Sequence, residues 1–324
     1  MSTPKLRWVV DWDGTITQKD TIGNLAYIAC ERHKHRTKDQ IIPPEDVDSI
    51  WNDIVSAYIK DYDQHLRSYR PPASERKTLQ EEIRWLESLR PVEQRSIERV
   101  EKSQIFKGLT DSDIQTGAEQ AVESEKITLR LGWETLLLTQ PGPVILSVNW
   151  STAFIRSVIR ANISRSALSE EQKAALILRY VVEDFPIPGN ELPGLFTSGG
   201  TTGKMSLGPG SGSELRTSAD KLRAFQSFKR ADEFRDDKWV YIGDSTTDLE
   251  CLLAADVGIM IVDDPRGRGQ KELFETLQRV GVWTQHVSSI SRETLEGPGK
   301  IVWWMNNFKD ILKTAERIKQ AYSS

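Results

Sequence analysis

The chain has 324 residues, of which 43 are Lys or Arg and 47 are Asp or Glu, so its formal net charge is −4. This balance gives no general reason to expect a nucleic-acid or membrane surface, and the length allows a sizeable core without crosslinks. The two cysteines have no metal-binding spacing, and no apolar run has the length of a membrane span or signal-peptide core, so we expect a soluble, cytoplasmic protein without structural zinc.

The first predicted element is a buried strand at residues 8–10, which is followed by two aspartates, Asp11 and Asp13. Asp and Gly are depleted in strands, so the stretch DWDGT ends the strand, and Gly14 supplies the bend. An acidic turn of this kind can be purely structural. A reactive carboxylate pair would also require further carboxylates for a metal, and a hydroxyl and a lysine for an anion.

From about residue 20 to residue 140 the pattern is helical, with few glycines and many charges. Residues 47–62 place apolar side chains at helical spacing, which is typical of an ordinary core-facing helix. RPPASE at residues 70–75 and LTDSD at residues 109–113 each end one helix and begin another. We expect an all-helical insertion of about 120 residues between the first strand and the rest of its sheet.

After residue 143, short apolar strands alternate with helices, which is typical of a parallel sheet covered on both faces. The Gly/Pro/Ser/Thr-rich residues 187–213 predict an irregular loop with one hairpin at most. Apolar residues on one face of residues 300–322 predict an amphipathic helix that closes the chain. The clearest strands are VILSV, WVYIGD and VGIMIV, at residues 144–148, 239–244 and 257–262.

These elements predict an α/β fold with two domains. Residues 1–19 and 141–324 would form a Rossmann-like parallel-sheet core, and residues 20–140 would form an inserted all-helical domain.

Two more aspartates follow a strand of this core in the stretch GDSTTDLE, where Asp244 leaves the strand and Asp248 lies four residues further on. In an open α/β sheet, ligands bind outside the carboxyl ends of the strands. Four carboxylates in one crevice repel one another, and oxygen ligands without His or Cys favour Mg²⁺. The sequence therefore predicts a magnesium site formed by Asp11, Asp13, Asp244 and Asp248.

Groups suited to an anion are also present. Ser147 ends the strand at residues 144–148 and places a hydroxyl at the same edge. Lys221 lies near the positively polarised start of a predicted helix, where an ammonium group can face a phosphate. Lys204 in TTGK is the alternative lysine.

With these motifs the sequence resembles the haloacid dehalogenase superfamily, specifically its phosphatases. The resemblance covers the sheet domain, about 190 residues. It rests on DWDGT at residues 11–15, Ser147 in LSVNWS, Lys221 in ADKL and GDSTTD at residues 243–248.

Two further stretches are most similar to the phosphoserine phosphatase-like branch of that superfamily: DWDGTIT followed by Asp20, and NEL at residues 190–192 followed by TTGK. In that branch the helical insertion is a cap over the active site. Asp20 is also placed as a natural helix N-cap, which we favour over substrate contact. The residues after Ser147 differ from the small, glycine-rich residues of phosphoserine phosphatases, so an amino-acid substrate is not implied.

The resemblance implies a role for each residue. Asp11 would be the nucleophile that forms an aspartyl phosphate, and Asp13 would be the general acid and base. Mg²⁺ would be held by Asp11, the main-chain carbonyl of Asp13 and Asp244, while Asp248 would orient metal-bound water or Lys221. The phosphoryl and substrate contacts would come from Gly14, Thr15, Ser147, Asn149 and Lys221.

The implied activity is hydrolysis of a small phosphorylated metabolite, with no nucleic-acid or membrane partner. A phosphomutase or phosphotransferase of the same superfamily shares these motifs and stays an alternative, as does a catalytically silent binding protein. Asp13 argues against a dehalogenase, because dehalogenases of this superfamily lack the second aspartate. The sequence decides neither the substrate nor the oligomeric state.

Overall fold

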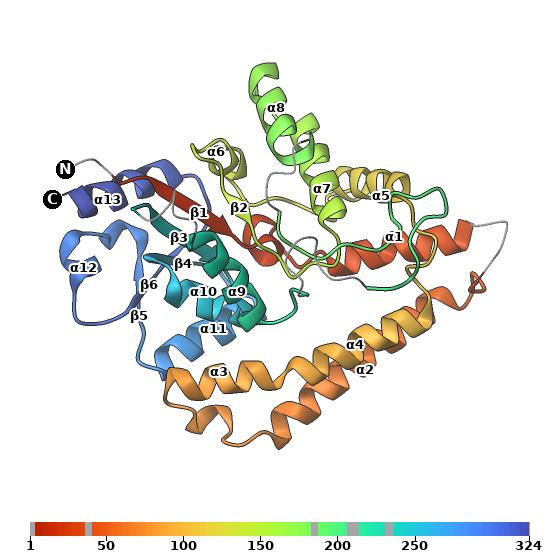
Figure 1. The fold of residues 1–324 in the computed structure, drawn as a ribbon, viewed down its shortest axis with the longest axis horizontal. Helices are drawn as coiled ribbons and strands as arrows, with labels where there is room; N and C mark the ends of the chain where they lie inside the picture. Colours follow the sequence, from red (N-terminus) through yellow and green to blue (C-terminus); the bar gives the residue numbers. More distant parts are fainter. Residues whose placement is uncertain (1–3, 36–40, 183–186, 206–213, 231–235, 324) are drawn as a thin grey trace.

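The computed structural model describes residues 4–35, 41–182, 187–205, 214–230 and 236–323. In these residues the centre of the molecule is a six-stranded sheet of order β2-β1-β3-β4-β6-β5, in which every neighbouring pair is parallel (Figure 1). The predicted α/β class is therefore confirmed. The strands are β1 (Leu6–Val10), β2 (Val144–Ile145), β3 (Lys238–Gly243), β4 (Val257–Ile261), β5 (Trp283–His286) and β6 (Ile301–Met305).

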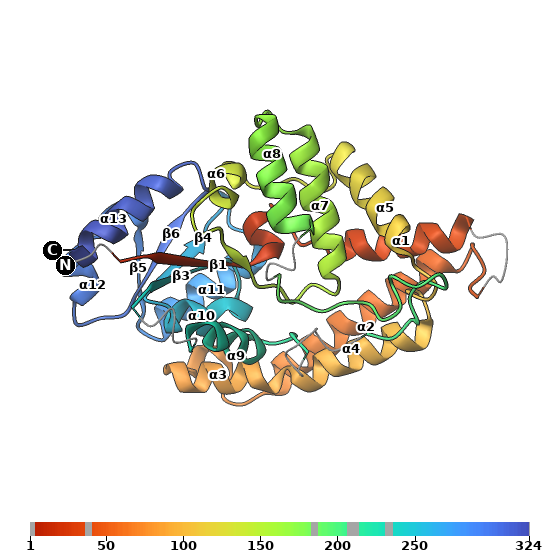
Figure 2. The ribbon, with the colours of Figure 1, turned by 45° about the horizontal axis from the view of Figure 1, so that its top comes forward.

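Both faces of the sheet are covered by apolar side chains. Successive side chains of a strand point to opposite faces, so neighbouring residues belong to different clusters. Val10 and Ile242 pack into one hydrophobic cluster, whereas Val9 and Tyr241 pack into the other. Figure 2 shows α13 (Ile311–Ser323) on one side of the sheet and three helices on the other side: α9 (Ser218–Lys229), α10 (Leu249–Ala254) and α11 (Arg268–Arg279). The remaining α-helices after residue 130, in the described part of the chain, are α6 (Trp133–Leu137), α7 (Thr152–Arg165), α8 (Glu170–Ile177) and α12 (Arg292–Glu296).

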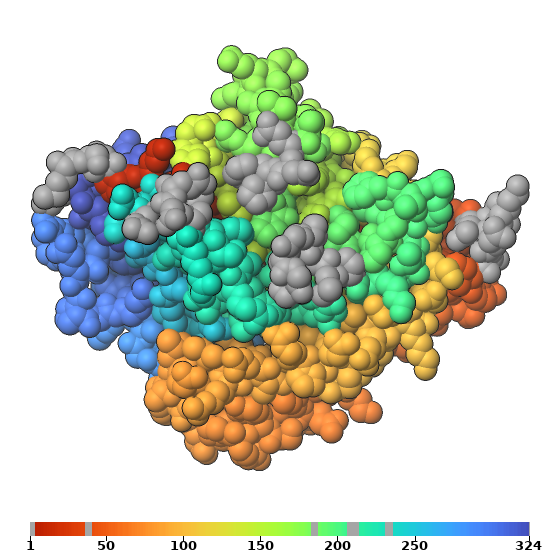
Figure 3. Space-filling view, in the orientation of Figure 1, coloured from red at the N-terminus to blue at the C-terminus, as the bar shows by residue number. Residues whose placement is uncertain are grey.

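The segment between β1 and β2 is helical, as predicted. Its main helices are α1 (Ile22–His35), α2 (Val47–Ser68), α3 (Leu79–Ser88), α4 (Arg90–Ser103) and α5 (Asp111–Glu123). The α2 and α4 helices lie side by side, and they form the lower flank of the face drawn in Figure 3, where α8 projects at the top. The α1 helix packs on α5, which packs on α7.

The α3 helix lies against the sheet domain. Its residues Trp85 and Leu86 belong to the same hydrophobic cluster as Phe225 of α9 and Leu273 of α11. The inserted helices thus continue into the packing of the core, and the domain boundaries at residues 20 and 140 stay a prediction.

The C-terminal segment differs from its prediction. Residues 301–305 form β6 instead of the start of a helix, and the helix begins only at Ile311. The run IVWWM combines β-branched and aromatic residues, and β6 pairs with β4 on one side and β5 on the other. A strand covered on both faces needs no polar alternation, so periodicity alone did not separate it from a helix.

Two other predictions need comment. The predicted strand VILSV is shorter in the structure, since only Val144 and Ile145 form β2. Residues 187–205 contain no regular helix or strand beyond an isolated bridge between Lys107 and Thr202, and residues 206–213 of the predicted loop lie outside the described part of the chain. Within the described residues, every helix is too short or too polar to span a membrane.

A buried ion-pair network fastens α3 to the core. The Glu82 carboxylate accepts hydrogen bonds from Arg76 Nε at 2.8 Å and from Arg279 Nη2 of α11 at 2.8 Å. Glu82 is 1 % exposed and Arg76 is 3 % exposed. The Glu82 carboxylate is therefore shared by two guanidinium groups that are largely withdrawn from water.

We predict that Glu82→Gln lowers the free energy of unfolding by about 3–5 kcal/mol, because breaking a buried pair leaves the opposite charge uncompensated. Glu81→Gln is the matched control, since Glu81 is only partly buried, in the capping box of α3, and Gln also serves there. Urea unfolding of both variants measures the difference. Equal, small effects would show that the network does not fasten α3.

Candidate active site

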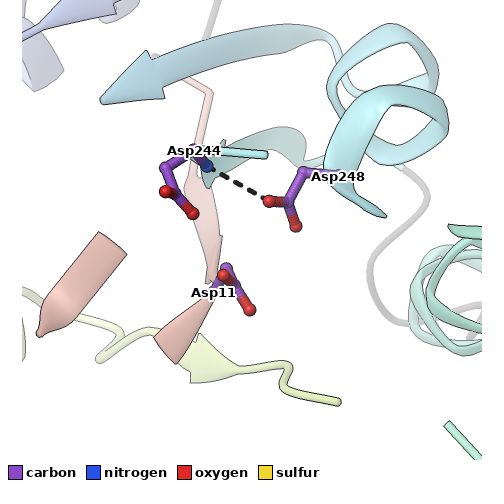
Figure 4. A group of neighbouring side chains, drawn as sticks. All are labelled: Asp11, Asp244 and Asp248. Atoms are coloured by element: carbon purple, nitrogen blue, oxygen red, sulfur yellow. Dashed lines mark hydrogen bonds between the residues drawn. The ribbon is translucent and has the colours of Figure 1, made fainter. Parts of the chain in front are cut away.

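Three aspartates meet at the carboxyl edge of the sheet. Asp11 follows β1, Asp244 follows β3, and Asp248 ends the 3-10 turn Thr246–Asp248 that leads into α10. Each offers a carboxylate oxygen within 4.8 Å of the others (Figure 4). The Asp11 amide donates to the Ile242 carbonyl at 2.9 Å, so the ladder between β1 and β3 extends to Asp11 itself.

A buried lysine joins two of these carboxylates. Lys221 Nζ donates to Asp11 Oδ1 at 2.6 Å and to Asp248 Oδ1 at 2.7 Å. Lys221 lies in the first turn of α9 and is fully buried, whereas Lys204 is exposed. The structure therefore brings Lys221, and not Lys204, to the site. Burial lowers the pKa of Lys221, but the charges of Asp11 and Asp248 outweigh burial and raise that pKa above its usual value.

The Asp248 carboxylate is surrounded by donors from the protein. Oδ1 accepts from Lys221 and, at 2.7 Å, from Tyr241 Oη. Oδ2 accepts from the Ser245 amide at 3.2 Å and from the Asp244 amide at 3.1 Å, the bond drawn in Figure 4. Asp248 thus anchors the lysine and the turn after β3. Sequence reasoning missed Tyr241, although a tyrosine inside the strand that leads to Asp244 was the available signal.

Gly14 makes room for Asp244. A Cβ atom at Gly14 would lie 2.3 Å from Asp244 Oδ2, and the Gly14 φ of +73° is in the left-handed region, so glycine is required here. Thr15 Oγ1 donates to Asp244 Oδ1 at 3.3 Å. The Gly14 amide donates to Thr17 Oγ1 at 3.1 Å, so the predicted phosphate contact of this amide requires that bond to be given up.

The Asp13 carboxylate points to a different set of partners. Its Oδ1 accepts from the Thr21 amide at 2.7 Å and from Thr21 Oγ1 at 2.5 Å, and its Oδ2 accepts from Asn149 Nδ2 at 3.0 Å. Only the main-chain carbonyl of Asp13 stays as its predicted contribution to a metal site. Burial and the nearby charge of Asp20 raise the pKa of Asp13 to about 6.

The second motif lies beyond β2. Ser147 and Asn149 are both buried, and the Asn149 amide donates to Ser147 Oγ at 3.0 Å. Because Val10 is paired with Ile145, Ser147 lies just past the level of Asp11 at the same edge. Asp20 Oδ1 accepts from the Ile22 amide at 2.8 Å where α1 begins, which is a capping interaction.

The carboxylates of this edge carry excess negative charge. Burial and the charge of Asp248 raise the pKa of Asp11 well above its usual value, and the same two causes raise the pKa of Asp244 to about 8. One lysine offsets only part of this repulsion. The donor set contains oxygen alone, so the site fits a hard divalent cation.

All four predicted motifs therefore lie along one edge of a Rossmann-like sheet, as the resemblance implied. The fold is an α/β fold with a Rossmann-like parallel sheet.

The chain has limited similarity to known proteins. No protein-family model matches the chain. A CTO1 family protein of Schizosaccharomyces pombe is 28 % identical over 284 residues, which cover 85 % of this chain and 88 % of that protein. A structure titled as a phospho-aspartyl intermediate analogue of phosphoserine phosphatase is 15 % identical, with a TM-score of 0.45 and coverage of 96 % of this chain and 99 % of that one.

A HAD family hydrolase from Salmonella enterica serovar Typhi is also 15 % identical, with a TM-score of 0.44 over 86 % of this chain and 72 % of that one. The function proposed below is supported by the side chains at the sheet edge rather than by these similarities.

We predict that Asp244→Asn stabilises the metal-free protein at alkaline pH. The pKa of Asp244 is raised on folding from 3.8 to about 8, so the wild type is stabilised at low pH and loses this stability as the pH rises between these values. Removing the charge should gain about 1–3 kcal/mol near pH 8, the usual order for an uncompensated buried polar group, and almost nothing near about pH 4.

Thermal unfolding in EDTA across this pH range measures the effect. Asp53→Asn, at an exposed position on α2, is the control and should follow the wild type. A variant at Asp244 that is less stable than the wild type at alkaline pH would contradict the repulsion described above.

Proposed function

We propose that the protein is a metal-dependent phosphatase that hydrolyses small phosphomonoesters through an aspartyl phosphate on Asp11. The observation that carries this proposal is the buried Asp11 carboxylate, which lies 2.6 Å from Lys221 Nζ and beside Asp244. A carboxylate so placed has one oxygen bound to an ammonium group and the other available as a nucleophile.

Mg²⁺ would be held by Asp11, Asp244 and the main-chain carbonyl of Asp13. When bound, the ion would supply positive charge that offsets the repulsion between a carboxylate and a phosphate dianion. Asp248 is better suited to an indirect role, because both of its oxygens already accept hydrogen bonds from protein donors. Of the two roles implied for Asp248, we favour the orientation of Lys221.

The protein's own residues would carry the two chemical steps. In the first, Asp11 attacks phosphorus, the bond from phosphorus to the ester oxygen breaks, and the departing oxygen takes a proton from Asp13. In the second, Asp13 accepts a proton from water as that water attacks phosphorus, which releases phosphate and frees Asp11. A pKa of about 6 suits Asp13 to both roles, because each protonation state is accessible near neutral pH.

The surrounding donors would place the phosphoryl group and Asp13. Ser147 Oγ and Lys221 Nζ lie at the sheet edge and would bind phosphoryl oxygens. Thr21 and Asn149 hold the Asp13 carboxylate, and Asp13 would turn from them toward the leaving group.

Burial of the reacting groups supports a small substrate. Asp11 is 3 % exposed, and Ser147 and Lys221 are fully buried. We expect a small molecule to reach these buried atoms more readily than a phosphorylated side chain on a folded protein does. We therefore propose a small phosphorylated molecule as the substrate.

We predict that activity on an aryl phosphate requires a divalent metal. EDTA should abolish turnover and Mg²⁺ should restore it, because the carboxylate cluster repels a phosphate dianion without the ion. Mg²⁺ should also raise the melting temperature of the wild type and of the Asp53→Asn control, but not that of Asp244→Asn. Full activity in a verified metal-free preparation would contradict the proposal.

We also predict that Asp11→Asn and Asp13→Asn have different effects on turnover. Asp11→Asn should abolish phosphoryl transfer, because a carboxamide is a far poorer nucleophile. Asp13→Asn should slow hydrolysis of an alkyl phosphate by about 10²- to 10⁴-fold, the usual worth of general acid catalysis, and slow the first step on an aryl phosphate much less.

The measurement pairs steady-state rates on alkyl and aryl phosphates with acid-quenched mass spectrometry, which should detect aspartyl phosphate in Asp13→Asn. Wild-type turnover by Asp11→Asn would exclude Asp11 as the nucleophile. Transfer of the phosphoryl group to an added alcohol, with little release of phosphate, would indicate a phosphotransferase instead.

A further inference from the structure

A buried arginine outside the four motifs binds the loop that carries Asp11. Arg130 is 4 % exposed and lies between α5 and α6. Its Nε donates to the Thr15 carbonyl at 3.0 Å, and its Nη2 donates to the Gly14 carbonyl at 2.9 Å. Nη1 donates to the Asn306 carbonyl at 3.3 Å, and the guanidinium also forms an ion pair with Asp263. One side chain thus holds two consecutive carbonyls of the catalytic loop.

The partner of Arg130 is itself held in place. Asp263 follows β4, its amide donates to Gln270 Oε1 at 2.8 Å, and Gln270 Nε2 donates to Asp263 Oδ2 at 2.7 Å. Gln270 lies on α11 and is 3 % exposed. The guanidinium is therefore anchored to β4 and α11, which do not include any of the four motifs.

The main chain adds to this attachment. The Arg130 amide donates to the Ile16 carbonyl at 2.7 Å, and the Gln18 amide donates to the Thr128 carbonyl at 3.0 Å. The segment that leaves the inserted helices thus runs along the end of the catalytic loop.

The same loop contacts Asp244 and carries Asp11, so it affects the distance between these two carboxylates. Gly14 packs against Asp244 so closely that a Cβ would meet the Asp244 carboxylate, and Thr15 Oγ1 donates to Asp244 Oδ1. Arg130 holds the carbonyls of these same two residues. A shift of the loop would therefore change the separation of Asp11 and Asp244.

We propose that Arg130 is a positioning residue that sets the separation between Asp11 and Asp244 by clamping the Gly14 and Thr15 carbonyls to Asp263. This inference rests on the function proposed above for Asp11 and Asp244. Arginine suits the task because its planar fork donates in several fixed directions, whereas a lysine ammonium on a flexible stem cannot reproduce that geometry.

The test compares Arg130→Lys with Arg76→Lys. Arg76 is also a buried arginine in an ion pair, but it belongs to the network that fastens α3 and lies outside the site. Arg130→Lys should lower kcat on an aryl phosphate by about 10- to 100-fold and raise the Mg²⁺ concentration for half-maximal thermal stabilisation by a similar factor. KM should change little, because no contact to substrate is removed. Arg76→Lys should lower the melting temperature but leave kcat and the Mg²⁺ response near those of the wild type.

Asp263→Asn is the second variant, since it leaves Arg130 in place and only weakens its anchor; it should show a smaller loss in the same two quantities. In Arg130→Ala, added guanidinium at millimolar concentration should restore part of the Mg²⁺ response, and ammonium at equal ionic strength should not.

If Arg130→Lys binds Mg²⁺ and turns over substrate like the wild type, or loses activity only in proportion to its melting temperature as Arg76→Lys does, the inference is wrong. If Arg130→Lys does not fold, Asp263→Asn decides it. A wild type that binds Mg²⁺ but hydrolyses no phosphomonoester would overturn the proposed function alone, because the Mg²⁺ response still tests the clamp.

Discussion

The buried ammonium group of Lys221 is the contact on which the candidate site depends. It joins Asp11, at the end of the first strand, to Asp248, in the turn before α10, although 210 residues separate it from Asp11. Both carboxylates are buried, so without the lysine they would lose the ammonium group that they share. Removing one partner of such a buried ion pair lowers the free energy of unfolding by about 3–5 kcal/mol. Lys221 therefore stabilises the fold in addition to its proposed role in binding phosphate.

One lysine does not balance the negative charge of the site. Asp11, Asp244 and Asp248 place three carboxylates against a single ammonium, and burial raises the pKa of Asp11 and Asp244. The arrangement is therefore costly for the metal-free protein near neutral pH. Clustered carboxylates of this kind favour the binding of positive charge. A divalent cation would reduce the repulsion between the carboxylates without a change in the fold.

The inserted helices contribute to the packing and hydrogen bonding of the sheet domain. Glu82 of α3 pairs with Arg279 of α11, and Arg90 of α4 donates to Asp220 in the first turn of α9 at 2.8 Å, one residue before Lys221. Arg130, at the end of the insertion, holds the loop that follows β1. The geometry of the motifs is thus maintained partly by residues that lie far from them in the sequence.

Local sequence patterns were enough to predict the fold class, the parallel strands that carry the motifs and the residue types at their ends. These follow from local patterns: an apolar run followed by Asp11, Ser147 or Asp244 marks a strand end, and parallel strands bring their carboxyl ends to one edge. Only the folded chain shows which lysine reaches Asp11, where the Asp13 carboxylate points, and that Arg130 binds the loop after β1. It also showed that residues 301–305 form a strand, which a run apolar on both faces does not reveal. Each of these depends on which distant segments meet, and neither periodicity nor motif spacing contains that information.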